Sequence, residues 1–384
     1  MESQFYLVVP PGLEDFAILE FTEKWPLIFL GSPLPELVKG KGGLSFTAPL
    51  DEAVRLNHYL KIPTRLLLRI AEFKCRDFPK LYQKLGKISW NLYLRGQIPE
   101  LEFSAKNSRL FDSRRAEKTL ADALKLYYKG QPPKKKHSDS LATIPPQKLY
   151  MRLEDDVCTV SMDTSGERLE RRGYRTHVGE APMRGSLASG LLLALKNELK
   201  NSLSLLDPMC GSGTFLLESA LFYTPTPRND FSYLFFPSLS HLPPFKGAPL
   251  KTAGLFSNHI GKDIDSKVLE AALHNREEAK LCDKEIAFTQ EDLFAQTQAT
   301  KESLAVICNP PYGERLSAGE IDKEFFDKML KALSDKYEAQ IIALLFPEHF
   351  GTPKSPKGLQ LIKQYKLSNG GLKVQFLIWK CSSL

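Results

Sequence analysis

A short segment around residue 309 joins three features that suit chemistry on an amino group. Its sequence, LAVICNPPYGERL, ends an apolar run with an amide, two prolines and a tyrosine. The Asn309 side-chain oxygen and the Pro310 carbonyl can each accept a hydrogen bond from an –NH2 group. The Pro310–Pro311 pair stiffens the backbone and removes competing N–H donors. The Tyr312 ring offers a face on which a planar group can stack.

An amino group on a nucleobase or an amide is a weak nucleophile because its lone pair is delocalised. Acceptors that hold the group and favour its developing charge promote its attack on an electrophilic carbon. No side chain needs a shifted pKa, because the proton is lost during or after the transfer. A structural Pro-Pro turn is the alternative interpretation, and the glycine-rich loop upstream favours the catalytic one.

That loop has the sequence DPMCGSGTF and begins at Asp207, where an apolar run ends. Gly211 and Gly213 permit positive φ angles, so a ligand can lie directly against the peptide. A helix is expected to follow at once and to present free N–H groups. The string lacks the third glycine of a dinucleotide fingerprint and the Gly-Lys-Ser/Thr of a phosphate loop. It therefore favours a nucleoside ligand without phosphates, and S-adenosylmethionine fits that description.

Two acidic residues follow later apolar runs of the same kind. Asp263 ends HIGKD and can accept hydrogen bonds from ribose hydroxyls. Its distance from the glycines exceeds that of the usual fingerprint, and a proline-rich insertion at 223–258 accounts for the excess. Asp292 in TQEDLF can accept a hydrogen bond from an adenine amino group. A helix cap is an equally good interpretation of Asp292.

Short apolar runs alternate with helical segments through the second half of the chain. This alternation is typical of a doubly wound parallel sheet, whose ligands lie at the carboxyl ends of the strands. The first half alternates strands and helices as a small α+β unit does. The fold expected is α/β overall.

Positive charge is concentrated in one stretch of the first half. Between Arg95 and Lys136 there are eleven Lys or Arg residues and five Asp or Glu, whereas the whole chain has a net charge of +7. The helix predicted over DSRRAEKTLADALKLYYKG carries basic residues on one face and apolar ones on the other. A solvated surface helix is the alternative to RNA contact. The predicted RNA-binding residues are Arg114, Lys118, Lys125, Lys129, Lys134, Lys135 and Lys136.

Composition excludes several classes of protein. The chain has no apolar span of the ~20 residues that a membrane helix needs, and its start lacks the pattern of a signal peptide. Its six cysteines are widely spaced, which argues against a zinc cluster or disulfide framework and for the reducing cytoplasm. No metal is expected, and neither DNA nor a membrane is an expected partner.

The quoted motifs, together with GKDIDSKVLEAALHN and FSAKNSRLFDSRRAEKTLADAL, resemble the THUMP-domain class I S-adenosylmethionine-dependent methyltransferases that modify guanine N2 in 23S ribosomal RNA. The likeness is tight from about Cys158 to Ala220 and around Asn309 to Leu316, and loose over the first hundred residues. It implies a ferredoxin-like unit at 1–48, a THUMP RNA-binding domain at 49–163 and a Rossmann-like methyltransferase domain at 164–384.

The resemblance also implies roles for individual residues. Arg184 and Leu187 belong to a segment that would close over the methionine end of the cofactor. The target pocket would be formed by Asn309, Pro310, Pro311 and Tyr312. The remaining cofactor contacts would come from Asp207, Pro208, Cys210, Gly211, Gly213, Thr214, Asp263 and Asp292. The partner implied is structured ribosomal RNA or an assembling large subunit, with the target guanine flipped into the cleft.

Other functions share parts of this pattern. A transfer-RNA methyltransferase of the same architecture would use the same pocket. Adenine-N6 DNA and protein glutamine methyltransferases also use an Asn-Pro-Pro-Tyr pocket, but the basic helix and the THUMP-like first half argue against both. A non-catalytic RNA-binding assembly factor is the alternative from a different class. Some relatives add a second methyltransferase domain, whereas this sequence is expected to contain a single methyltransferase domain.

Overall fold

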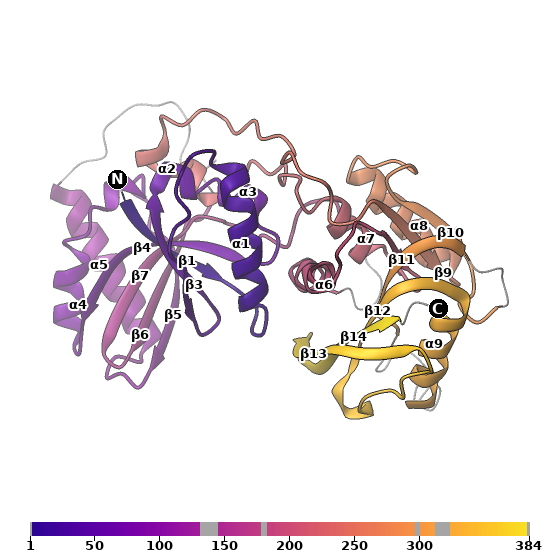
Figure 1. Cartoon of the computed structure of the whole chain (residues 1–384). Helices are drawn as coiled ribbons and strands as arrows, with labels where there is room; N and C mark the ends of the chain where they lie inside the picture. The colour runs from indigo at the N-terminus through magenta and orange to yellow at the C-terminus, as the bar shows by residue number, and fades with distance from the viewer. Residues whose placement is uncertain (1, 131–144, 178–182, 296–299, 312–322, 382–384) are drawn as a thin grey trace. The chain divides into compact units, whose positions relative to one another are not determined.

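The structure is a computed structural model that describes residues 2–130, 145–177, 183–295, 300–311 and 323–381 (Figure 1). Its contacts form two compact units, each built from three separate stretches of chain. The first unit comprises Met1–Val9, Phe29–Leu169 and Thr226–Gly247; the second comprises Pro10–Ile28, Glu170–Pro225 and Ala248–Leu384. The domains 1–48, 49–163 and 164–384 are contiguous and remain a proposal, whereas each observed unit takes a segment from the middle of the other's sequence.

A seven-stranded sheet forms the centre of the first unit. Neighbouring strands are antiparallel except β5 and β6, which are parallel. In spatial order the strands are β2 (Val38–Gly40), β3 (Gly43–Pro49), β1 (Glu2–Val8), β4 (Arg65–Lys74), β7 (Val157–Asp163), β6 (Lys148–Glu154) and β5 (Glu100–Lys106).

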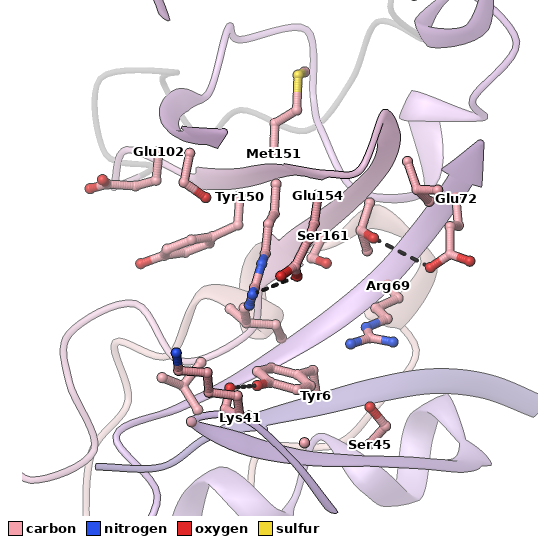
Figure 2. A pocket seen from close by; sticks show the side chains of 18 of the residues that line it. Tyr6, Lys41, Ser45, Arg69, Glu72, Glu102, Tyr150, Met151, Glu154 and Ser161 are labelled. Atoms are coloured by element: carbon pink, nitrogen blue, oxygen red, sulfur yellow. Dashed lines mark hydrogen bonds and ion pairs between the residues drawn. The ribbon is translucent and has the colours of Figure 1, made fainter. Parts of the chain in front are cut away.

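The two faces of this sheet differ in polarity. Side chains such as Phe5, Leu68 and Met162 are buried on one face. On the opposite face, polar and aromatic side chains, together with several aliphatic ones, line an open hollow of about 710 Å³ (Figure 2). Because successive side chains of a strand point to opposite faces, one apolar set suffices for the core and the other set is left facing the hollow.

Helices α4 (Phe78–Leu85) and α5 (Ser113–Gly130) lie side by side in the first unit (Figure 1). The predicted amphipathic helix is confirmed in α5, where Ala116, Leu120 and Leu124 are buried. Asp112 caps the start of this helix by accepting a hydrogen bond from the Arg115 amide at 3.1 Å.

The segment LDEAVRLNHY forms two short helices rather than one, α2 (Leu50–Ala53) and α3 (Leu56–Tyr59). The amides of Arg55 and His58 bond to carbonyls three residues back, which tightens the turn between them. The Asn57 amide group donates to the Val54 carbonyl at 2.8 Å and to the Thr164 hydroxyl at 3.0 Å. Local side-chain bonds of this kind compete with a regular helix.

The proline-rich insertion contributes Thr226–Gly247 to the first unit, where it packs around His58. The rings of His58 and Phe245 are stacked with centroids 3.6 Å apart, and Phe231 meets the same imidazole edge-on at 4.5 Å. Tyr233 Oη lies 2.8 Å from His58 Nε2. The short 3₁₀ helices η3 (Ser232–Phe235) and η4 (Pro237–Leu239) lie in this segment, and η1 (Trp90–Leu92) contacts η4.

The second unit contains the doubly wound sheet that the sequence predicts. Its strands lie in the order β10 (Ala287–Gln290), β9 (Asn258–Asp263), β8 (Ser204–Asp207), β11 (Thr300–Cys308), β12 (Tyr337–Pro347), β14 (Leu372–Cys381) and β13 (Leu359–Asn369). The first five are parallel, and β14 and β13 form the antiparallel closing hairpin. The chain order reverses between β8 and β11.

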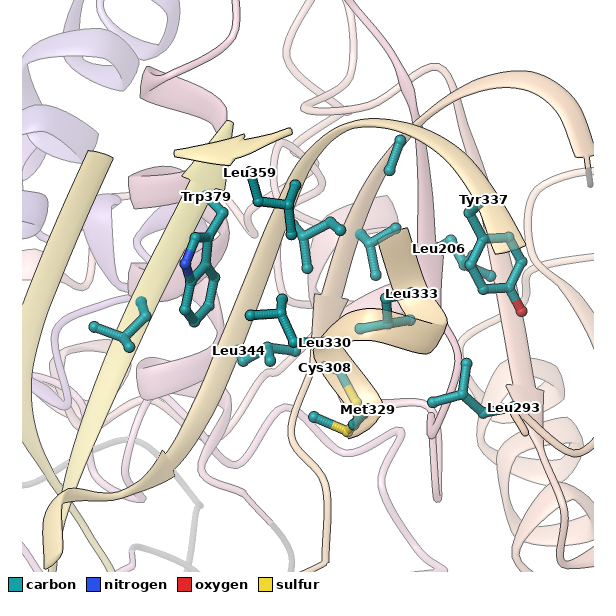
Figure 3. Close-up of a cluster of buried hydrophobic side chains, with 14 of the residues drawn as sticks. Leu206, Leu293, Cys308, Met329, Leu330, Leu333, Tyr337, Leu344, Leu359 and Trp379 are labelled. Atoms are coloured by element: carbon teal, nitrogen blue, oxygen red, sulfur yellow. The ribbon is translucent and has the colours of Figure 1, made fainter. Parts of the chain in front are cut away.

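Helices α6 (Gly185–Asn197), α7 (Thr214–Ala220), α8 (Ser266–Glu278) and α9 (Lys323–Lys336) belong to this unit, which also includes η5 (Glu348–Phe350). Helix α9 supplies Met329, Leu330 and Leu333 to a buried cluster with Leu344 and Trp379 (Figure 3). These side chains are buried completely or nearly so. Burial of such apolar surface is the main favourable contribution to the stability of the sheet.

Helix α1 (Glu14–Ile28) also belongs to the second unit and contacts α6, although it lies near the start of the chain. Its buried face includes the ion pair of Glu20 and Lys24, whose nitrogen and oxygen are 2.6 Å apart. The Lys24 ammonium also donates to the Phe222 carbonyl at 2.7 Å. Burial lowers the pKa of Lys24, so these partners are needed to keep the ammonium charged.

The docking of the insertion on His58 is expected to weaken in acid. Burial lowers the pKa of His58 from 6.5 to about 4, and the hydrogen bond to the Thr226 carbonyl offsets this only in part. Between these two values the unfolded chain binds a proton that the folded protein does not. Stability is therefore retained above pH 6.5 and falls as the pH drops towards 4.

Between pH 7.5 and pH 5, the wild type should lose about 2 kcal/mol more unfolding free energy than His58→Gln. Chemical denaturation at both pH values measures this difference. His241→Gln, which removes an exposed imidazole of the same insertion, is the control and should behave as the wild type. An equal pH dependence in wild type and His58→Gln would contradict the neutral, buried imidazole.

Candidate active site

The sheet of the second unit brings the two predicted motifs together at the point where chain order reverses. Strands β8 and β11 are parallel neighbours, with Leu206 opposite Val306. The loop that starts at Asp207 and the segment that starts at Asn309 therefore leave the same edge of the sheet from adjacent strands. Ligands of doubly wound sheets bind in the crevice at such a reversal.

The glycine loop has the open backbone that the sequence predicts. Gly211 and Gly213 have φ angles of +52° and +80°. A Cβ atom at Gly211 would meet no atom within 4 Å, so the loop leaves free space directly against its peptide. Helix α7 begins at Thr214, with Gly213 at its N-cap position. The loop thus combines room for a ligand with the free N–H groups of a helix start.

Asp263 at the end of β9 holds this loop in place. One of its carboxylate oxygens accepts from the Gly211 amide at 2.9 Å, and the other accepts from the Asp265 amide at 3.1 Å. The Cys210 amide donates to the Lys262 carbonyl at 2.9 Å. Asp265 then caps α8 by accepting from the Lys267 amide. A carboxylate oxygen has lone pairs to spare, so Asp263 can still accept from a ligand hydroxyl.

Buried acidic groups gather where β8, β9 and β11 end. Burial raises the pKa of Asp207 well above its usual value, and the nearby Asp263 charge raises it further. Burial likewise raises the pKa of Cys308, followed by the charges of Asp207 and Asp263. Cys210 behaves in the same way. The two thiols are therefore protonated, which makes them unsuitable as nucleophiles.

Asn309 carries an unused acceptor at this edge. Its side-chain oxygen Oδ1 is buried and has no hydrogen-bond partner among the described residues. A buried amide oxygen without a partner costs free energy unless a ligand or water satisfies it. Pro310 is buried and Pro311 half-buried beside it. Tyr312, the fourth residue of the predicted pocket, lies outside the described residues.

A network of charges that the sequence analysis did not predict supports the loop that contains Asp292. Glu291 pairs with Lys262 at 2.7 Å and with Lys336 of α9 at 2.8 Å. Lys336 also lies within hydrogen-bonding distance of the Asp292, Leu293 and Ala295 carbonyls. Burial alone would raise the pKa of Glu291, but the bonds and charges of the two lysines lower it. Asp292 itself accepts from the Phe294 amide at 2.9 Å.

A second network anchors the helix that follows the glycine loop. Glu218 of α7 is 1% exposed and accepts from Arg172, from the Tyr174 hydroxyl and, at 2.8 Å, from the Ser189 hydroxyl. Three donors around one buried carboxylate hold α7 against α6 and the segment that precedes it. One signal in the sequence could have indicated this network, because Glu218 interrupts the apolar run TFLLESAL.

The remaining predicted cofactor contacts differ in exposure. Leu187 of α6, Pro208 and Thr214 are buried, whereas Arg184 at the N-cap of α6 is exposed. The predicted RNA-binding residues on α5 are all exposed. Of these, Lys125 pairs with Asp122 at 3.7 Å. Lys134, Lys135 and Lys136 lie outside the described residues.

Two further features bear on the kind of site. Within the described part of the chain, no group of three or more His, Cys, Asp or Glu side chains could hold a metal ion. None of the helices described here is long and apolar enough to cross a membrane.

A family model described as the RMKL-like methyltransferase domain matches residues 172–376, just over half of the 384-residue chain. The chain belongs to this family. The matched stretch contains the glycine loop, Asp263, Asp292 and Asn309. The methyltransferase resemblance drawn from the motifs is therefore confirmed.

Named relatives extend the likeness over nearly the whole chain. Ribosomal RNA large subunit methyltransferase K/L of Syntrophotalea carbinolica is 29% identical over 97% of this chain, and that of Vibrio cholerae is 29% identical over 96%. The chain spans 53% and 52% of these two proteins, about half their length. A Synechocystis sp. protein with a provisional RNA-methyltransferase name is 28% identical over 97% of this chain and 95% of its own.

Solved structures share the fold at low identity. SMU.472, a methyltransferase-like protein crystallised with S-adenosylhomocysteine, matches with a TM-score of 0.75 and 22% identity over 100% of this chain and 99% of its own. TrmN from Thermus thermophilus matches with a TM-score of 0.64 and 18% identity over 99% of this chain and 100% of its own. These matches confirm the Rossmann-like methyltransferase architecture.

Replacing Lys336 by Met should loosen the Asp292 loop, because the change removes one cation from Glu291 and the contacts to three carbonyls. We expect the unfolding free energy to fall by about 2 kcal/mol and amide hydrogen exchange at 291–295 to accelerate. Lys331→Met, an exposed lysine of the same helix, is the control. Exchange at 291–295 that is equally slow in both variants would show that the network does not hold the loop.

Proposed function

We propose that this protein transfers a methyl group from S-adenosylmethionine to the exocyclic N2 of a guanosine in large-subunit ribosomal RNA. The observation that supports this most directly is the buried Asn309 Oδ1, which has no partner among the described residues and follows the strand next to the one that leads into the glycine loop. The large-subunit methyltransferase names of the relatives suggest the same class of RNA.

The residues present fit the cofactor. The empty space against Gly211 admits a ligand that touches the peptide, and the start of α7 offers amide donors. In the proposed complex, Asp263 accepts hydrogen bonds from the ribose hydroxyls and Asp292 accepts one from the adenine amino group. The remaining proposed contacts are Arg184, Leu187, Asp207, Pro208, Cys210, Gly213 and Thr214. Bound there, S-adenosylmethionine supplies an electrophilic methyl group on a positively charged sulfur.

The acceptor side of the site is formed by Asn309, Pro310, Pro311 and Tyr312. Asn309 Oδ1 and the Pro310 carbonyl each accept one hydrogen of the guanine amino group, which fixes the direction of its lone pair. This lone pair would attack the methyl group that S-adenosylmethionine supplies, forming the N–C bond while the C–S bond breaks and its electrons pass to sulfur. Two carbonyl oxygens stabilise the positive charge that develops on nitrogen. The methylated nitrogen then releases a proton to water.

The RNA is proposed to contact the exposed basic face of α5 through its phosphates, along with Lys134, Lys135 and Lys136. A guanine inside an RNA duplex cannot reach a pocket at the carboxyl end of a β-strand. The target nucleotide must therefore be unpaired or flipped out before it meets Asn309.

Replacing Asn309 by Ala should reduce the rate of methyl transfer roughly hundredfold or more, since one of two acceptors is lost. The affinity for S-adenosylmethionine should stay within about twofold, because the amide touches only the amine. Transfer of radiolabelled methyl groups to ribosomal RNA measures the first quantity, and calorimetry measures the second.

Asn201→Ala removes an exposed amide of the same unit and serves as the control for both measurements. Undiminished turnover in Asn309→Ala would remove this residue from the acceptor site. Nucleoside mass spectrometry of the product decides the target: N2-methylguanosine supports the proposal, and N6-methyladenosine refutes it. Transfer to transfer RNA in preference to ribosomal RNA would favour the alternative substrate of the same chemistry.

A further inference from the structure

Every residue that lines the hollow on the first unit's sheet belongs to the first unit (Figure 2), whereas the methyltransferase motifs belong to the second. Its volume of about 710 Å³ falls within the range of small-molecule and cofactor sites. Its floor is the face of the sheet opposite the apolar core. A hollow of this size on regular strands is a preformed surface for a flat ligand.

Strand register places the lining side chains in two transverse rows. The first row consists of Arg69 on β4, Ser161 on β7, Tyr150 on β6 and Glu102 on β5. The second row consists of Glu72, Thr159, Arg152 and Ser104 on the same four strands. Arg69 and Tyr150 are two strands apart, so their Cα atoms are about 10 Å from one another. That spacing leaves room for a planar ring between the two side chains.

The guanidinium group of Arg69 has N–H donors available for a ligand. Its guanidinium lies 4.9 Å from the centroid of the Tyr6 ring and is half-buried. Burial lowers the pKa of Arg69, and the charge of Glu72 opposes that shift. The part of the chain that the structure describes gives this guanidinium no hydrogen bond or ion pair. A half-buried guanidinium in this state favours an incoming acceptor.

Tyr150 presents a second unsatisfied group. Its ring is half-buried, and its hydroxyl makes no hydrogen bond within the described residues. The Arg65 guanidinium lies 5.9 Å from the ring centroid. Tyr150 therefore offers the hollow both an aromatic face and a hydroxyl that can donate or accept.

The charges around the hollow are mixed. Glu72, Glu102, Glu154 and Asp155 accompany Lys41, Arg69 and Arg152 among the lining residues. A surface that follows an RNA backbone is predominantly positive, so this hollow does not suit a run of phosphates. Donors, acceptors and aromatic faces in one place match the edge and face of a nucleobase instead.

We propose that this hollow binds an unpaired nucleobase of the RNA substrate, stacked on Tyr150 and bonded through its acceptor edge to Arg69. Carboxylates such as Glu102 would accept hydrogen bonds from the donor groups of the same base. The inference rests on the proposed function in one respect, namely that the ligand is RNA. It differs in place, since the base bound here is not the one that is methylated.

The other ligand that mixed charge could suit is an arginine-rich protein segment. A cationic side chain would satisfy the carboxylates but would leave Arg69 facing a like charge. A nucleobase carries no charge and provides the acceptor that Arg69 lacks. The unsatisfied guanidinium therefore favours a base over a cationic segment.

The test measures binding of a short, labelled single-stranded RNA to the full chain by fluorescence anisotropy, without cofactor, over a series of salt concentrations. Tyr150→Ala and Arg69→Gln should each weaken binding about tenfold. The slope of log Kd against log salt should be unchanged in Tyr150→Ala, because stacking releases no counterions. Tyr150→Phe, which retains the ring, should bind within about twofold of the wild type.

Two matched variants elsewhere on the first unit serve as controls. Tyr82→Ala removes a half-buried tyrosine from α4, and Arg76→Gln removes an exposed guanidinium. Both should bind RNA as the wild type does. A cross-linking experiment on the wild-type protein tests the proposal even if a variant of the hollow fails to fold. RNA carrying 5-iodouracil, irradiated in the complex, should cross-link to peptides that contain Tyr150 or Tyr6.

Equal RNA binding by all variants would overturn the proposal even if the wild type methylates RNA. Cross-links found only outside β1 and β6, the strands of Tyr6 and Tyr150, would overturn it as well. Specific binding of an arginine-rich peptide that Tyr150→Ala abolishes, with RNA binding unaffected, would overturn it in favour of a protein partner. Cross-links at Tyr150 from a protein that transfers no methyl group would support the hollow as an RNA site and refute the proposed activity instead.

Discussion

The parallel pairing of β8 with β11 is the constraint on which the site depends. The two strands are separated by about a hundred residues of sequence, yet their register fixes where the glycine loop and the Asn-Pro-Pro segment emerge. The proposed binding places of the methyl donor and of the target amine thus follow neighbouring parallel strands. The buried cluster between α9 and the neighbouring strands keeps that register in place.

Around the ends of β8, β9 and β11, charged side chains hold the loops and α7 through hydrogen bonds and ion pairs. Glu218 holds α7 through three donors, Asp263 holds the glycine loop through the Gly211 amide, and Glu291 joins Lys262 to Lys336. Breaking a buried pair by removing one partner is costly, so each network has few alternative arrangements. Asn309 Oδ1, a buried polar atom without a partner among the described residues, lies where we propose that substrate binds.

Much of the fold could be predicted because its signals are local. The amphipathic α5 follows from the spacing of Ala116, Leu120 and Leu124, and the strands of the second unit follow from short apolar runs that end in polar residues. The interrupted apolar run marks Glu218 as unusual, but the partners of Glu218 and Glu291 could not be predicted, because they are far apart in sequence. The same holds for the insertion, since nothing near Phe231 or Phe245 indicates that both rings pack on His58. Such long-range pairing depends on the tertiary fold rather than on local pattern.

The central claim is that the Asn309 pocket modifies one guanine of large-subunit RNA. Mass-spectrometric mapping of ribosomal and transfer RNA from a strain that lacks the gene tests it most directly. The account predicts the loss of a single N2-methylguanosine from large-subunit RNA, restored by the wild-type gene but not by one encoding Asn309→Ala. Unchanged N2-methylguanosine throughout both classes of RNA would contradict it.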